Sequence, residues 1–109
     1  MNKTIINKKI LDAILEKIIK IANPDKVILF GSYARNEARP GSDIDLLVVK
    51  KGVEQRKKLA QDIYVSLVGI PASVDVVVET PERLEKYRNM PWMVYKYILS
   101  EGIVVYGQS

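Results

Sequence analysis

Apolar residues recur every three or four positions near the start of the chain, and this spacing predicts a helix over about residues 3–22. Asn23-Pro24-Asp25 ends this helix, because proline lacks the amide hydrogen that a helix requires. The same spacing predicts a second long helix over residues 54–69, which Gly69-Ile70-Pro71 closes. The apolar stripe of the first helix consists of Ile10, Leu11, Ile14, Leu15, Ile18, Ile19 and Ala22.

Short runs of apolar and β-branched residues predict four strands, over residues 27–30, 43–49, 73–79 and 103–106. The C-terminal half of the 43–49 run is apolar at every position. This pattern is typical of a strand in the middle of a sheet, covered on both faces. We therefore place this strand at the centre of the sheet.

Three shorter helices are expected between and after these strands. One spans about residues 33–38, and another begins at Thr80-Pro81-Glu82, where threonine caps the helix and proline occupies its first position. The last spans about residues 92–101 and ends at Gly102. In that helix Trp92, Tyr95 and Leu99 share one face, which we interpret as core packing.

This order of elements predicts an α/β (α+β) fold, with a small mixed β-sheet and helices packed on one side. The 109 residues suffice for one hydrophobic core, so we expect a single domain over residues 1–109. No apolar run approaches the ~20 residues of a membrane helix, and the N-terminus lacks the features of a signal peptide. We therefore expect a cytoplasmic protein without a membrane partner.

The composition excludes several kinds of chemistry, because the chain contains no cysteine and no histidine. Any general base must be Asp, Glu, Lys or Tyr, and any metal must be held by oxygen atoms, which favours Mg²⁺, Mn²⁺ or Ca²⁺. The net charge of +4 suits an anionic ligand such as a nucleotide or RNA, but on charge alone we favour a lysine-rich soluble surface. We interpret the basic cluster as such a surface; it comprises Lys50, Lys51, Arg56, Lys57 and Lys58.

Two motifs at strand ends carry candidate chemistry. Gly31-Ser32 follows the first strand, where glycine lets backbone amides approach an anion closely and serine adds a hydroxyl. Asp43-Ile44-Asp45 begins the second strand, where side chains two apart point to the same face. Two adjacent carboxylates repel unless a cation lies between them. Taken alone, each motif is also compatible with an ordinary turn or a solvent-facing strand.

Asp75 is the third candidate acid, in the strand over residues 73–79. It shares one strand face with Ser73, Val77 and Glu79. Simple alternation on a half-exposed strand explains it without any function. Beside Asp43 and Asp45, it would complete a three-acid metal site or accept a proton from an attacking hydroxyl.

Together these residues resemble a known family. Gly31-Ser32, ten further residues and Asp43-Ile44-Asp45 match the Gly-Ser-x10-Asp-x-Asp signature of the polymerase-β-like nucleotidyltransferases. The longer strings over residues 30–35, 41–48 and 101–106 are similar to the minimal nucleotidyltransferase branch, and the resemblance covers about residues 5–107. It implies the nucleotidyltransferase fold.

The resemblance also implies roles for individual residues. Asp43 and Asp45 would bind two Mg²⁺ ions, Asp75 would be the third acid near the acceptor hydroxyl, and Gly31 and Ser32 would hold the β- and γ-phosphates of ATP. An in-line attack on the α-phosphorus would release pyrophosphate.

Two residues after the Gly-Ser pair leave questions open. The branch usually has glycine where this chain has Asn36, which is tolerated if its φ angle is positive. Arg35 could contact phosphate, but we favour a local ion pair.

Small domains of this kind resemble the antitoxin of a two-gene pair with a HEPN-type ribonuclease toxin, which implies AMP transfer to a toxin tyrosine. Three alternatives stay open: transfer to a small molecule or an RNA end, an antitoxin that acts by binding alone, and a nucleotide-binding regulator. Nucleic acid is the less favoured partner.

Overall fold

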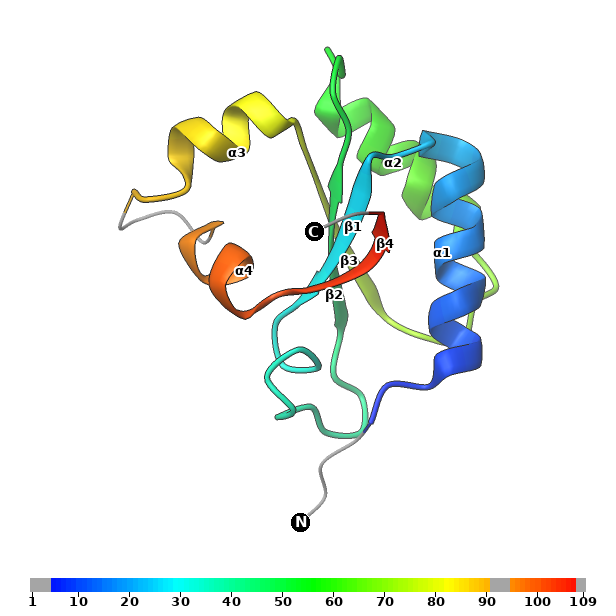
Figure 1. The fold of residues 1–109 in the computed structure, drawn as a ribbon. Helices are drawn as coiled ribbons and strands as arrows, with labels where there is room; N and C mark the ends of the chain where they lie inside the picture. Colours follow the sequence, from blue (N-terminus) through cyan, green and yellow to red (C-terminus); the bar gives the residue numbers. More distant parts are fainter. Residues whose placement is uncertain (1–4, 91–94, 108–109) are drawn as a thin grey trace.

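The computed structural model describes residues 5–90 and 95–107 and contains one mixed four-stranded sheet (Figure 1). The strands lie in the order β3-β2-β1-β4; β1 is antiparallel to β2 and β4, and β2 is parallel to β3. The elements are α1 (Lys8–Ala22), β1 (Lys26–Phe30), β2 (Ile44–Val49), α2 (Arg56–Ser66), β3 (Val74–Glu79), α3 (Pro81–Tyr87), α4 (Tyr95–Glu101) and β4 (Ile103–Gly107).

Helix α1 has a defined signal at each end. The Asn7 side chain accepts a hydrogen bond from the Ile10 amide at 3.1 Å, and Asn23 ends the helix in the left-handed conformation with φ of 46°. The apolar faces of α1 and α2 cover one face of the sheet and form the larger core. Its most buried members include Ile14, Ile18, Val27, Leu46, Val48 and Ile63.

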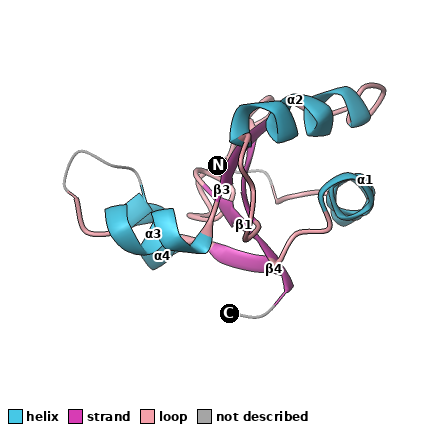
Figure 2. Cartoon of the chain, turned by 90° about the horizontal axis from the view of Figure 1, so that it is seen from above, coloured by secondary structure: helices cyan, strands magenta, loops and turns pink. Residues whose placement is uncertain are grey.

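Helices α3 and α4 lie on the opposite face of the sheet, as the view in Figure 2 shows. A second core there joins the sheet to Leu84 of α3 and Ile98 of α4. The predicted α/β (α+β) fold with a small mixed sheet is confirmed, but its helices cover both faces rather than one. Helices are required on the second face because Leu47 and Val49 of β2 point away from α1 and must also be buried.

The predicted strands agree with the structure to within about two residues at each end. Thr80 caps α3, because its side chain accepts a hydrogen bond from the Arg83 amide at 3.2 Å. Helix α2 is shorter than the predicted 54–69, and of its residues only Ile63 is fully buried. Trp92 lies outside the described residues; Tyr95, on the predicted core face of the last helix, is buried.

One buried carboxylate joins three helices to the end of β3. The Glu79 side chain is 0% exposed and accepts hydrogen bonds from Arg83 Nε at 2.8 Å, Arg56 Nη1 at 3.4 Å and the Tyr95 hydroxyl. The Thr80 amide donates a further bond at 3.1 Å. A buried charge persists only with such partners, so Glu79 connects α2, α3 and α4 to the sheet.

In the described part of the chain, no helix combines the length and the apolar character needed to cross a membrane.

Glu79→Ala should lower the free energy of unfolding by about 2–4 kcal/mol, because the buried Tyr95 hydroxyl loses its acceptor and two arginines lose their counter-charge. Urea denaturation measures this change. The matched control is Glu85→Ala, which removes an exposed pair with Arg88 and should cost less than about 1 kcal/mol. Equal losses in the two variants would show that Glu79 does not hold the helices.

Candidate active site

The register between β2 and β3 brings the predicted acids together. Asp45 of β2 lies opposite Asp75 of β3, and neighbouring strands are only about 4.8 Å apart. Both side chains point to the face that α3 and α4 cover further along the strands, and Asp43 lies two residues before Asp45 on the same side. Asp43 and Asp75 are exposed and Asp45 is half-buried. The three acids therefore meet at the N-terminal ends of the two parallel strands.

Each acid has a different immediate partner. Ser73 Oγ donates a hydrogen bond to Asp43 Oδ1 at 2.5 Å, and the Tyr64 hydroxyl donates to Asp75 Oδ1 at 3.3 Å. Burial raises the pKa of Asp45, and the negative charges of Asp75 and Asp43 raise it further. Arg35 acts in the opposite direction on this pKa. Both other carboxylates therefore affect the pKa of Asp45, as expected for groups that share one site.

These three acids fit a hard divalent cation by their chemistry, since all their donor atoms are carboxylate oxygens. Among residues 5–90 and 95–107, however, no three acidic side chains form a group arranged to hold a metal ion. Asp43 and Asp75 instead accept hydrogen bonds from the Ser73 and Tyr64 hydroxyls.

The Gly-Ser turn lies directly against the central acid. Phe30, the last residue of β1, pairs with Asp45, and Gly31 follows with a φ angle of 75°. A Cβ atom on residue 31 would lie 2.1 Å from Asp45 Oδ2, so a side chain there would force the Asp45 carboxylate to shift. Glycine therefore provides both the left-handed backbone conformation and the close packing of the turn against Asp45.

The segment after Ser32 is a single turn, so the predicted helix over residues 33–38 is wrong. The Arg35 amide donates to the Gly31 carbonyl at 3.1 Å and the Glu37 amide to the Ser32 carbonyl at 2.8 Å. Asn36 then adopts a left-handed conformation with φ of 59°, which a helix cannot continue. The positive φ also explains why asparagine can replace the usual glycine. A helix dipole cannot be invoked here, so Gly31 and Ser32 themselves are the candidate anion-binding groups.

Arg35 forms the local ion pair that the sequence favoured. Its Nε atom lies 2.9 Å from Glu37 Oε1, and its Nη1 atom lies 3.9 Å from Glu101 Oε2 at the end of α4. It still lowers the pKa of Asp45, so its charge acts on the site.

Sequence reasoning missed two residues of the site, Ser73 and Tyr64, which hold Asp43 and Asp75. The strand pattern placed Ser73 on the face of Asp75, so a signal for it existed. Tyr64 comes from α2, and nothing in its sequence context connects it with β3.

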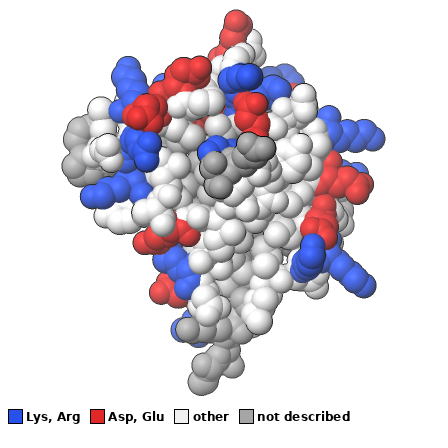
Figure 3. Space-filling model, in the orientation of Figure 1, with Lys and Arg blue, Asp and Glu red and all other residues white. Residues whose placement is uncertain are grey.

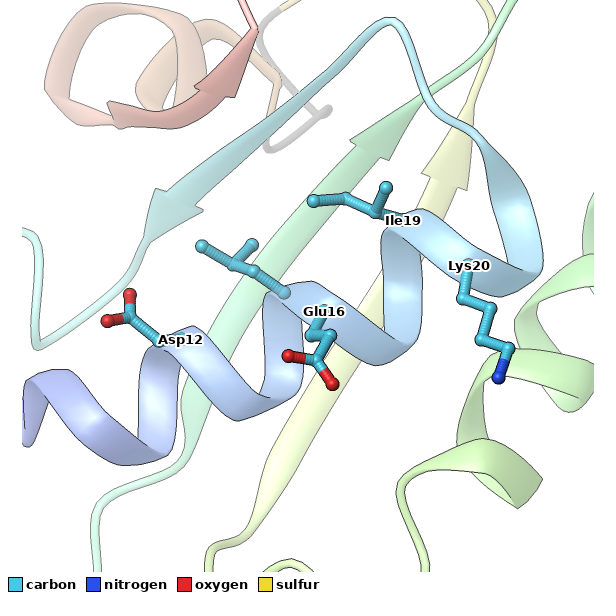
Figure 4. Close-up of a pocket in the computed structure, with 5 residues that line it drawn as sticks. Asp12, Glu16, Ile19 and Lys20 are labelled. Atoms are coloured by element: carbon cyan, nitrogen blue, oxygen red, sulfur yellow. The ribbon is translucent and has the colours of Figure 1, made fainter.

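Two other surfaces lie outside this site. The hollow in Figure 4 runs along α1 and contains none of the candidate residues; Asp12, Glu16, Ile19 and Lys20 line it together with Leu15. In the basic cluster, Lys58 pairs with Asp62 at 2.6 Å and Lys50 binds the Asn23 carbonyl at 2.9 Å. On the face drawn in Figure 3, basic and acidic side chains are interspersed around the rim. These contacts agree with a solvated charged surface.

Residues 8–105 match the family model described as the nucleotidyltransferase domain. The chain therefore belongs to the nucleotidyltransferase domain family, which confirms the family resemblance noted in the sequence.

Two proteins of Methanocaldococcus jannaschii, both provisionally assigned as protein adenylyltransferases, are similar to this chain. One is 35% identical over a segment that covers 74% of this chain and 77% of the relative. The other is 38% identical over 62% of this chain and 50% of the relative, so the chain spans about half of that protein's length.

Two crystal structures share the fold. A protein from Sulfolobus solfataricus, provisionally assigned as a nucleotidyltransferase, aligns with a TM-score of 0.61 and 24% identity over 92% of this chain and 79% of that chain. A toxin–antitoxin structure with AMP-PNP aligns with a TM-score of 0.59 and 23% identity over 95% of this chain and 76% of that chain.

Gly31→Ala should destabilise the domain by about 1–3 kcal/mol more than Gly52→Ala, because only the first change places a Cβ against Asp45. Gly52 is a matched control, since its φ angle of 80° is similar and no atom lies within 4 Å of the point that an alanine Cβ would occupy. Chemical denaturation of both variants measures the difference. Equal destabilisation would mean that the contact with Asp45 is unimportant.

Asp45→Asn should leave the melting temperature at neutral pH equal to or above that of the wild type when divalent cations are removed. The raised pKa of Asp45 means that folding favours its protonated form. This contribution is full below the ordinary aspartate pKa and is lost as pH rises through the raised value, so the charged wild type carries the penalty at neutral pH. The variant's advantage should vanish well below pH ~4.

Differential scanning calorimetry across this pH range checks the sign. Asp12→Asn, in an exposed pair with Lys8, makes the same charge change away from the three acids and is the control. A fall of more than ~5 °C in Asp45→Asn at neutral pH would instead indicate a structural role.

Proposed function

We propose that this chain is a metal-dependent nucleotidyltransferase that moves AMP from ATP to a hydroxyl, most directly a tyrosine, of a partner protein. The observation that carries the proposal is the register that sets Asp45 opposite Asp75, with Gly31 against Asp45. Membership of the nucleotidyltransferase domain family supports the reaction class. The provisional assignment of two relatives as protein adenylyltransferases supports a protein acceptor.

The order of the strands suggests how the substrates lie. Gly31-Ser32 follows β1, Asp45 lies on the adjacent β2, and Asp75 lies on β3 beyond it. We place the β- and γ-phosphates at Gly31-Ser32, the α-phosphorus near Asp45 and the acceptor hydroxyl near Asp75. Leaving group, phosphorus and acceptor then lie in a row across three strands, as in-line displacement requires.

Different residues of the chain bind phosphate, hold the metal ions and accept the proton. The turn at Gly31-Ser32 holds phosphate oxygens through its amides and the serine hydroxyl. Asp43, Asp45 and Asp75 would hold two Mg²⁺ ions, which neutralise phosphate charge when bound. We place Asp75 closest to the acceptor. Because the chain has no histidine to act as the general base, Asp75 takes the proton of the acceptor hydroxyl. Arg35 adds positive charge beside Asp45.

A toxin is the partner that we favour, with this chain as the cytoplasmic antitoxin. The fold is shared with a toxin–antitoxin structure that contains AMP-PNP, and the sequence resembles antitoxins paired with HEPN-type toxins. Modification of a toxin tyrosine would then inactivate the toxin. Transfer to a small molecule or an RNA end is the principal alternative, whereas a purely binding antitoxin would have no need for three facing carboxylates.

Asp75→Asn should lower AMP transfer by at least ~10²-fold while ATP affinity changes little, because Gly31, Ser32 and the other two acids still hold the nucleotide. The partner is recovered by affinity purification from the native host and incubated with α-labelled ATP and Mg²⁺. Label on the partner, its mass gain and ATP affinity are measured separately.

Asp62→Asn is the control, since Asp62 only pairs with Lys58 on the surface of α2, and it should transfer at the wild-type rate. A wild-type protein that leaves no AMP on its partner contradicts the proposed reaction. Normal transfer by Asp75→Asn contradicts only the role given to Asp75.

A further inference from the structure

A tyrosine hydroxyl of the chain already lies at the third acid. Tyr64 belongs to α2, which lies beside the β3 edge of the sheet (Figure 2). Its hydroxyl lies 3.3 Å from Asp75 Oδ1, and it accepts a hydrogen bond from the Val76 amide at 2.7 Å. The Val76 carbonyl lies 3.4 Å away and competes for the same hydroxyl proton. The side chain therefore reaches around the edge strand to the acid.

This position is the one that the proposed reaction gives to the acceptor. The acceptor oxygen must lie within hydrogen-bonding distance of the group that takes its proton, on the far side of the α-phosphorus from the pyrophosphate. Asp75 is that group, and β3 is the strand furthest from Gly31-Ser32 among the three that carry the site. Tyr64 thus lies at the acceptor end of the row formed by β1, β2 and β3.

The Tyr64 side chain is also accessible to solvent. Tyr64 is 40% exposed, and two further exposed apolar side chains lie near it in sequence, Val65 of α2 at 73% and Val68, just after α2, at 82%. In contrast, Tyr95 is 6% exposed and bonded to Glu79. Among the described tyrosines, only the Tyr64 hydroxyl forms a hydrogen bond to one of the three site acids.

We propose that Tyr64 is itself an acceptor, so that the chain transfers AMP from ATP to its own Tyr64 hydroxyl when no partner occupies the acceptor side. This inference rests on the proposed adenylyl transfer. The Tyr64 oxygen attacks the α-phosphorus and forms a new P–O bond. The bond from the α-phosphorus to the oxygen bridging to the β-phosphate breaks, pyrophosphate leaves with that electron pair, and the phenolic proton passes to Asp75.

The product is a phosphodiester that joins Tyr64 to AMP. Formation of this bond removes the hydroxyl proton, so the Tyr64 oxygen can no longer donate to Asp75 or to the Val76 carbonyl. The AMP group would remain beside Asp75 and occupy the acceptor side. Modified chains would therefore compete poorly for a protein acceptor, which links self-modification to the activity of the same site.

The test incubates the purified full chain alone with Mg²⁺ and α-labelled ATP, followed by intact-mass measurement and peptide mapping. One added AMP per chain, located on Tyr64, is expected. The rate should not change when the protein is diluted, because the attack is intramolecular. γ-labelled ATP should leave no label, which separates AMP transfer from phosphorylation.

Two variants test whether Tyr64 is the residue that accepts AMP. Tyr64→Phe should lose the self-label but still bind ATP, because Gly31 and Ser32 are unchanged. Tyr97→Phe removes another exposed tyrosine, on α4, and should be labelled normally. The primary readout is the modified peptide of the wild type, so it does not depend on how well Tyr64→Phe folds.

The outcomes separate this inference from the proposed function. If the wild type labels its partner but never Tyr64, the self-modification is wrong and partner transfer stands. If Tyr64 is labelled but the partner is not, self-modification stands and the partner assignment fails. No label on either contradicts both, and label on another residue of the chain overturns the assignment to Tyr64.

Discussion

The parallel register of β2 and β3 is the constraint on which the candidate site depends. It places Asp45 opposite Asp75 with both side chains on one face, and the antiparallel register of β1 places Phe30 opposite Asp45, so that Gly31 follows directly beside it. Because side chains alternate along a strand, a slip of one residue in β3 would turn Asp75 to the face of α1 and α2 and bury it in the larger core. The apolar residues that fix the register, Val76 and Val78 on that face, therefore also fix the chemistry.

The same face of β3 carries two acids with opposite environments. Asp75 lies at the exposed start of the strand, whereas Glu79, four residues later, is fully buried beneath α3 and α4. Two arginines neutralise Glu79 and the Tyr95 hydroxyl donates a hydrogen bond to it, so Glu79 has a structural role and its end of the face is closed. At the open end, Asp43, Asp45 and Asp75 form no salt bridge with a described residue, so their negative charge is not neutralised in the same way. One face of β3 is therefore covered by α3 and α4 at its C-terminal end and carries the candidate site at its N-terminal end.

The sequence predicted the strands, the long helices and the three acids because each depends on local patterns: alternation, helical spacing and a spaced motif. Its failures have physical causes beyond those patterns. A turn forms where a helix was predicted over residues 33–38, because Asn36 adopts a left-handed conformation that a helix cannot continue. Helices cover both faces of the sheet because Leu47 and Val49 must be buried on the face opposite α1. Alternation along the strand placed Glu79 on the same face as Asp75, but it could not show that Glu79 is buried whereas Asp75 is exposed. Tyr64 reaches Asp75 only through the packing of α2 on the sheet edge, which no local pattern contains.

The central claim is that Asp43, Asp45 and Asp75 hold metal ions beside a nucleotide bound at Gly31-Ser32. A crystal structure of the wild type with Mn²⁺ and a non-hydrolysable ATP analogue tests it most directly, because anomalous scattering locates the ions independently of the protein coordinates. We expect anomalous peaks within carboxylate bonding distance, about 2–2.6 Å, of Asp43 and Asp45. The phosphate chain should contact Gly31 and Ser32. Nucleotide bound elsewhere, such as in the hollow along α1, with no peak at the three acids, would contradict the claim.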